Sequence, residues 1–175
     1  MDEAAAAAAP IIVSAVFGDA DHARLDGLRR QHFPPERNQL AAHLTMFHHL
    51  PPSIAPELST RLVRVTRGPR PPARFASVMN LGRGVALRVH SPVLEGIRAE
   101  LAEAFAGVLT PQDAGGWRPH VTIQNKAAPS AAKALLEKMS REFSPRSLEI
   151  AGLAAFHYRG GPWELIRRFP FRGGG

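Results

Sequence analysis

The chain has 175 residues, of which 45% are hydrophobic, and it contains no cysteine. This is enough for one compact unit with a sizeable core, and it excludes disulfides, a thiolate nucleophile and a cysteine-based metal site. The formal net charge of +7 favours a polyanionic partner such as RNA, although the arginines are scattered and general arginine enrichment explains the charge equally well. No apolar stretch reaches the roughly 20 residues of a membrane helix, so we expect a cytoplasmic protein without a membrane span.

Apolar periodicity, capping residues and turn residues predict alternating strands and helices. In chain order we expect a strand over 11–17, a helix from Asp19 or Asp21 to about 32, a strand over 43–50, a helix from Ser53 to about 65, strands over 74–81 and 85–90 joined by a hairpin at Gly82-Arg83-Gly84, a helix from Ser91-Pro92 to about 105, a strand from 120, a helix from Ser130 to about 143, and strands over 148–158 and 163–169. This order favours an α+β or mixed α/β fold.

The domain organisation follows from the same signals. We expect a disordered leader over 1–10, one domain over 11–171 and a flexible tail over 172–175. The three prolines and one glycine of 67–72 predict a linker between two lobes. The two halves have the same order of elements, and this weak internal repeat predicts two similar lobes related by a pseudo-twofold axis.

The repeat is clearest in two tetrapeptides, His43-Leu44-Thr45-Met46 and His120-Val121-Thr122-Ile123, whose histidines are 77 positions apart. In a strand, residues two apart share a face. Each histidine therefore lies on the same face as its threonine, and the apolar pair lies on the other. The pattern predicts buried apolar sides and two His/Thr faces lining one cleft.

These side chains suit metal-free acid–base chemistry on a phosphate ester. An imidazole with an ordinary pKa near 6.5 can give or take a proton at neutral pH. Threonine hydroxyls can donate hydrogen bonds to non-bridging phosphoryl oxygens as charge builds there. No carboxylate lies in or beside either motif, so we predict neither a metal nor a cofactor.

The paired motifs resemble those of the 2H phosphoesterase superfamily, in its 2′-5′ RNA ligase and cyclic phosphodiesterase branch. Arg118-Pro119 before His120 is similar to the R-P-H-V-T form of that family, and the resemblance covers roughly 11–169. It implies a bilobal fold with antiparallel sheets lining a central cleft and helices outside. It also implies hydrolysis of 2′,3′-cyclic phosphate ends of RNA or nucleotides, or the related 2′-5′ ligation. We expect the protein to be a monomer.

The resemblance implies a role for each matching residue. His43 would donate a proton to the leaving ribose oxygen, His120 would activate water, and Thr45 and Thr122 would bind the phosphate. The symmetry of the motifs leaves the donor and acceptor roles interchangeable on the sequence alone.

The chain departs from the family pattern over 47–51 after the first motif, and at Gln124-Asn125-Lys126 after the second. These departures leave the group attached to the phosphate open. One alternative is therefore a phosphodiesterase for a small cyclic phosphate such as an ADP-ribose derivative. Another is a module that binds RNA ends or nucleotides in the same cleft without turnover.

Further candidates lie beside the motifs. Arg83 in the hairpin and Arg118 before the second motif are candidate substrate-binding residues, because a guanidinium pairs well with phosphate. Lys126, which also flanks the second motif, could contact phosphate in the same way. A metal site including His48 and His49 is disfavoured, since neighbouring strand residues point in opposite directions. Candidates for stacking on a base are Phe47, Tyr158 and Trp163.

Overall fold

Two four-stranded antiparallel sheets form the centre of the molecule in a computed structural model, which describes residues 9–173. The first sheet has the order β2-β1-β7-β8 and the second β5-β4-β3-β6. The strands are β1 (Ile11–Phe17), β2 (Leu44–Leu50), β3 (Arg74–Asn80), β4 (Val85–His90), β5 (His120–Gln124), β6 (Arg146–Ser147), β7 (Ile150–His157) and β8 (Glu164–Pro170). The mixed α+β class and the two-lobed arrangement predicted from the sequence are confirmed.

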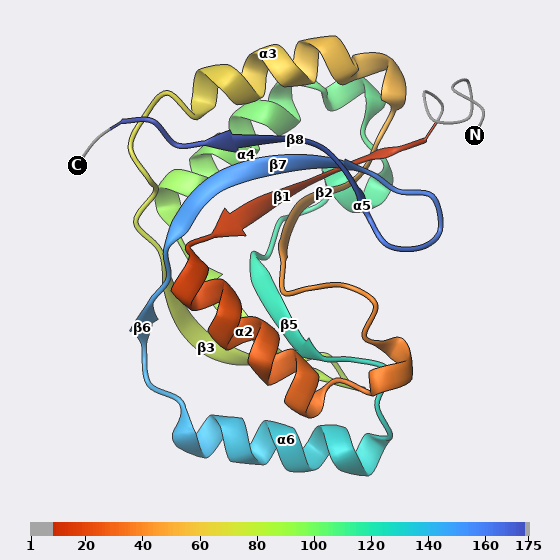
Figure 1. Ribbon diagram of the computed structural model, residues 1–175, viewed down its shortest axis with the longest axis vertical. Helices are drawn as coiled ribbons and strands as arrows, with labels where there is room; N and C mark the ends of the chain where they lie inside the picture. The colour runs from red at the N-terminus through yellow and green to blue at the C-terminus, as the bar shows by residue number, and fades with distance from the viewer. Residues whose placement is uncertain (1–8, 174–175) are drawn as a thin grey trace.

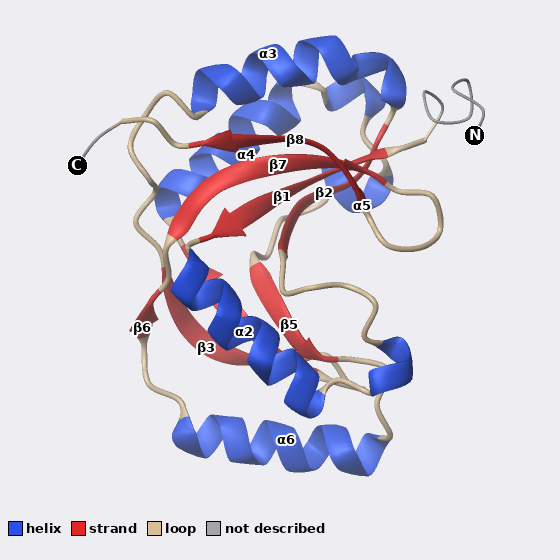
Figure 2. Cartoon of the chain, viewed as in Figure 1, coloured by secondary structure: helices blue, strands red, loops and turns tan. Residues whose placement is uncertain are grey.

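Helices lie against both sheets (Figures 1 and 2). They are α2 (Asp19–His32), α3 (Ala55–Val65), α4 (Pro92–Ala104), the short α5 (Pro111–Ala114) and α6 (Pro129–Glu142), with 3-10 turns at Pro35–Arg37, Pro52–Ile54 and Ala106–Val108. The first sheet packs beside α3 and α4, and the second packs beside α2 and α6. The chain thus crosses between lobes several times, once through residues 67–72 between α3 and β3.

The two motif strands, β2 and β5, are edge strands of different sheets, and they lie next to each other. Their apolar residues are fully buried: Leu44, Met46, Val121 and Ile123 all belong to the hydrophobic core. This anchoring fixes the strand faces, because a slip by one residue would exchange the core face and the cleft face. The partly exposed His and Thr side chains are therefore held on the cleft side.

The predicted helix starts at Ser53 and Ser130 are wrong. A 3-10 turn occupies Pro52–Ile54, so α3 begins only at Ala55, and Ala128 precedes the first residue of α6. Neither serine caps its helix through its side chain. At α4 the prediction is confirmed, because the Ser91 hydroxyl accepts a hydrogen bond from the Leu94 N–H.

The strand predicted over 148–158 forms as β7, although β7 begins only at Ile150. The two-residue strand β6 directly before this segment was not predicted. β6 pairs with β3 in the second sheet, whereas β7 pairs with β1 and β8 in the first. The chain crosses between the sheets at Leu148 and Glu149, and the polar residues of β6 carry no strand pattern that would reveal this crossing.

The β3–β4 hairpin forms at the predicted glycines. Gly82 has a φ of +84°, which a residue with a side chain rarely adopts. At Gly84, an added Cβ would overlap the carbonyl oxygen of Gln124 and the Cα of Asn125. The missing side chain lets the start of β4 approach the end of the motif strand β5.

Most of the predicted leader lies outside the described residues, as do the last two residues of the predicted tail. The described parts are held by backbone hydrogen bonds: Pro10 accepts from the Tyr158 N–H at 3.0 Å, and the Gly173 N–H donates to Gly68 at 2.9 Å. Among the described residues, no helix is both long and apolar enough to cross a membrane.

Candidate active site

The four motif side chains meet in one cavity of about 400 Å³ between the two sheets. His43 and Thr45 come from the β2 side, and His120 and Thr122 come from β5. Each is partly exposed, whereas the residues between them are buried. The alternation of the two tetrapeptides thus brings two imidazoles and two hydroxyls to a common space.

The two imidazoles are held in the same way. His43 Nδ1 lies 2.8 Å from the carbonyl oxygen of Ala41, and His120 Nδ1 lies 2.7 Å from that of Arg118. A carbonyl oxygen only accepts, so Nδ1 carries the hydrogen in both rings. In the neutral form each ring then leaves Nε2 with a free lone pair that can accept a proton, and the protonated ring can release it again.

The two histidines differ in their surroundings. Burial lowers the pKa of His43 to about 4, although the hydrogen bond to Ala41 acts in the opposite direction. The positive charges of Arg29, His120 and His48 lower this pKa further. His43 is therefore neutral in the free protein at pH 7.

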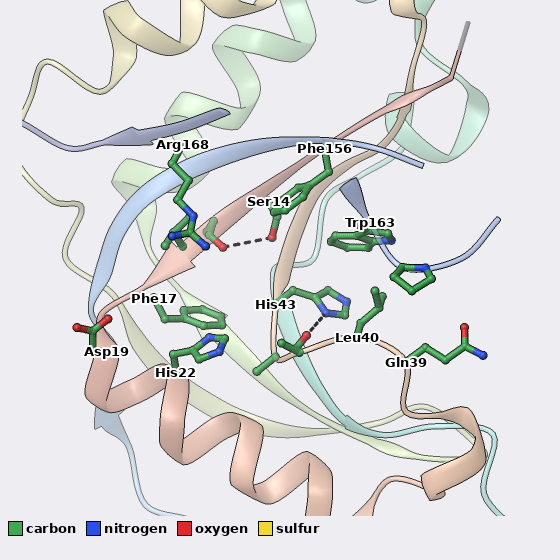
Figure 3. Close-up of a pocket in the computed structure, with 15 residues that line it drawn as sticks. Ser14, Phe17, Asp19, His22, Gln39, Leu40, His43, Phe156, Trp163 and Arg168 are labelled. Carbon is green, nitrogen blue, oxygen red and sulfur yellow. Dashed lines mark hydrogen bonds between the residues drawn. The ribbon is translucent and has the colours of Figure 1, made fainter. Parts of the chain in front are cut away.

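Trp163, just before β8, covers one side of His43. The ring centroids are 4.7 Å apart with an angle of 59° between the planes, and Trp163 in turn contacts Phe156 at 5.5 Å. A second cavity of about 390 Å³ lies beyond His43 and Trp163, over the inner face of the first sheet (Figure 3). Phe17, Phe156 and Arg168 also line it.

Arg29 on α2 supports β5 from behind. Its side chain is buried, and it donates to the carbonyl oxygen of Thr122 at 2.8 Å and to Asn38 Oδ1 at 3.0 Å. The same guanidinium lies 4.5 Å from the ring centroid of Phe33. Arg29 therefore ties the second motif to α2 and to the loop that leads into the first motif.

We expect Arg29→Ala to lower the free energy of unfolding by about 2–3 kcal/mol, since it leaves two acceptors without their charged donor. Chemical denaturation monitored by circular dichroism measures the change. The control is Arg30→Ala on the same helix: its exposed ion pair with Asp26 at 3.4 Å should contribute less than about 1 kcal/mol. Equal losses for the two variants would contradict the supporting role of Arg29.

On the other side of the cavity, a buried network supports β2. The carboxylate of Asp113 accepts from the His48 and His49 N–H groups and from His48 Nδ1. Arg98 donates to the carbonyl oxygens of Met46 at 3.0 Å and Asp113 at 2.7 Å, and Trp117 Nε1 donates to Thr45 at 3.0 Å. The edge of β2 is thus closed by side chains and by the loop containing α5.

The arginine candidates separate in space. Arg118 lines the cavity of the two motifs. Arg83 does not: its Nε donates to the carbonyl oxygen of Ala127 at 3.2 Å, and it lines a smaller cavity with Arg37 and Lys126. Lys126 has a φ of 57°, the one positive φ among the described residues other than glycine.

The aromatic candidates also separate. Phe47 is fully buried in the core under Arg98, so it is not available to stack on a base. Tyr158 is exposed and, like Trp163, lines a cavity beside His43. Among residues 9–173, no three His, Asp or Glu side chains are grouped in a way that could hold a metal ion.

The model of the 2′-5′ RNA ligase superfamily matches residues 17–162, most of the chain. The chain belongs to the 2′-5′ RNA ligase superfamily. The resemblance to 2H phosphoesterases that the motifs predicted is thereby confirmed.

Solved structures share the superfamily fold with this chain. TT0787 of Thermus thermophilus is 18% identical with a TM-score of 0.62, over 95% of this chain and 100% of its own. LigT of E. coli, complexed with 3′-AMP, is 17% identical with a TM-score of 0.64, over 94% and 98%. A structure described as a phosphoesterase is 16% identical with a TM-score of 0.58, over 94% and 98%. No curated protein matches the chain.

Several residues that shape the site in this superfamily member were not predicted from the sequence. Arg29 follows Leu25 by four positions and so lies on the buried stripe of α2, which is a usable signal. Asp113 has no such signal. It sits in a short polar loop, and only the path of β2 brings the loop beneath His48.

Proposed function

We propose that the chain is a metal-independent phosphodiesterase that hydrolyses 2′,3′-cyclic phosphate ends of RNA or nucleotides by two-histidine acid–base catalysis. The observation that carries the proposal is the shared cavity, which both His/Thr pairs line with each Nδ1 bonded to a backbone carbonyl. Superfamily membership supports the class of reaction.

In the proposed step, one imidazole takes a proton from water as the water oxygen attacks phosphorus. The bond from phosphorus to one ribose oxygen breaks, and the second imidazole gives that oxygen a proton. Thr45 and Thr122 donate to the non-bridging oxygens, and Arg118 at the rim of the cavity adds positive charge. The reverse step, with a ribose hydroxyl in place of water, is 2′-5′ ligation.

Family resemblance assigns His43 as the proton donor and His120 as the base. In the free protein His43 is neutral, because its pKa is lowered to about 4. The donor role therefore requires that the bound phosphate, an anion next to the ring, restores the proton to His43. The opposite assignment uses His43 in its neutral form, and the pair of rings permits both.

The test is a panel of phosphate esters assayed in excess EDTA. It comprises a nucleoside 2′,3′-cyclic phosphate, an oligonucleotide with the same end, a 2′-5′ linked dinucleotide and a cyclic phosphate of ADP-ribose. We expect turnover of the first two, in which each cyclic phosphate is opened to a single phosphomonoester. Turnover of the ADP-ribose compound alone would identify the small-molecule alternative, and tight binding without product would identify a binding module.

The cytoplasmic location and the monomeric state expected from the sequence belong to the same proposal. Light scattering on the purified protein and fractionation of the producing cells test them.

A further inference from the structure

His48 is a third histidine in the cavity of the two motifs, and the two-histidine scheme gives it no task. Its side chain is 44% exposed, whereas the carboxylate of Asp113 behind it is 0% exposed. His48 Nδ1 lies 3.3 Å from Asp113 Oδ1. Because an ionised carboxylate only accepts, Nδ1 carries the hydrogen and Nε2 is left for a ligand, and it donates to an anionic ligand when the ring carries a hydrogen on both nitrogens.

The carboxylate of Asp113 is built to stay ionised. Burial alone would raise its pKa, yet the hydrogen bonds from the His48 ring and from the His48 and His49 N–H groups hold the pKa below its ordinary value. A buried charge with this many donors orients the His48 ring firmly. The same hydrogen bonds satisfy the extra backbone N–H groups of a bulge, where residues 48 and 49 of β2 oppose the single residue Ile12 of β1.

His48 lies further along β2 than the residues that hold the reacting phosphate. It follows Thr45 by three positions, which is at most about 10 Å of strand, because the pairing of β2 with β1 is irregular over this stretch. His48 therefore reaches a group that flanks the reacting phosphate.

The charge of the cavity identifies that group. The ionisable side chains that line it are all basic, namely His43, His48, Arg98, Arg118 and His120. None of its lining residues is Asp or Glu. The nearby acid Asp113 is buried: its carboxylate accepts hydrogen bonds from His48 and His49, and its backbone carbonyl oxygen accepts one from Arg98. A flanking group that enters this space meets hydrogen-bond donors and positive charge, which favours an anion.

We propose that His48, oriented by Asp113, binds a second phosphate of the substrate, on the 5′ side of the nucleotide that carries the reacting phosphate. This deepens and rests on the proposed function, since it selects substrates with a 5′-phosphate or an internucleotide phosphate over unphosphorylated nucleosides. Asp113 is a positioning residue, because it acts through the His48 ring.

Binding of two adenosine ligands tests the proposal without relying on turnover. Adenosine 3′-monophosphate and adenosine 3′,5′-bisphosphate are titrated by calorimetry into the protein and its variants. We expect the bisphosphate to bind more tightly, His48→Ala to reduce the ratio of the two Kd values about tenfold, and His48→Gln to restore part of it. The ratio is used because partial unfolding lowers both affinities alike.

His49→Ala is the matched control, because His49 is the exposed neighbour that does not line the cavity. It should leave the ratio intact. Asp113→Asn should lower the ratio. It should also remove the ¹⁵N NMR signal that reports a hydrogen bound to Nδ1 of His48.

Three results would overturn the assignment: equal binding of the two ligands, a ratio unaffected by His48→Ala, or a ratio lost in Arg83→Ala or Lys126→Ala instead. The last would place the second phosphate at the opposite end of the cleft. Absence of turnover with these binding ratios intact would contradict the proposed hydrolysis and leave the role of His48 standing.

Discussion

His43→Ala and His120→Ala should each reduce kcat for a nucleoside 2′,3′-cyclic phosphate by about 10²–10⁴-fold. Each variant removes one of the two groups that move a proton in the transition state, and each such transfer contributes a factor of this size. The measurement is steady-state turnover in excess EDTA. The double variant should be little worse than the worse single variant, because the two rings act as a unit.

The fold should survive both substitutions. Neither side chain belongs to the hydrophobic core, which on these strands consists of the intervening apolar residues. Circular dichroism and thermal unfolding check this directly. His90→Ala is the matched control, since His90 is an exposed histidine on β4 outside the cavity. Full activity in either motif variant would remove the basis of the proposed function.

The local parts of the fold were predictable because they depend on short-range patterns. The alternation in 43–46 and 120–123 predicted which side chains are buried, and Leu44 and Val121 are indeed fully buried. The glycines between β3 and β4 predicted a hairpin, because a tight return needs a positive φ, which Gly82 supplies. Ser91-Pro92 marked the start of α4 for a similar local reason.

The assembly of the sheets was not predictable from such patterns. β1 pairs with β7, some 140 residues further along the chain, so the first lobe is built from both ends of the sequence. The break between β6 and β7 exists only because the chain changes sheets there. Pattern and spacing describe one strand at a time and carry no information on its partner.

At the site, too, local patterns were predictable and contacts between distant segments were not. The four motif residues were identified from the sequence, and the structure places them in one cavity. The bulge in β2 was missed, and with it the reason why Asp113 binds the N–H groups of both His48 and His49. The strand is irregular here, yet His48 lines the cavity and His49 does not.

The acidic limb of kcat/KM against pH should lie near pH 4, well below the ordinary pKa of histidine. This profile reports the free protein, in which burial lowers the pKa of His43 to about 4. The reactive form carries one proton on the pair of imidazoles, so the limb has the same position whichever ring is the acid. NMR titration of the His43 ring measures the same pKa without turnover.

Trp163→Ala should move this limb upward by one to two pH units, since it removes the ring that covers His43 at 4.7 Å and lets water reach the imidazole. At pH 5 the variant should then lose about two- to tenfold in kcat/KM relative to its own plateau, while the unaltered protein loses little. Tyr158→Ala, an exposed neighbour on the same loop, should leave the limb in place. An unchanged His43 pKa in Trp163→Ala would show that the Trp163 ring does not shield the imidazole from water.

The same pKa has a consequence for stability. The unfolded chain binds a proton at residue 43 near pH 6.5, whereas the folded protein binds it only near pH 4. Between these values the unfolded state holds more protons, so the free energy of unfolding should fall as the pH falls through this window. In Trp163→Ala the two pKa values approach each other and the decline should be shallower. Because this slope needs no substrate, it tests the burial of His43 independently of any activity.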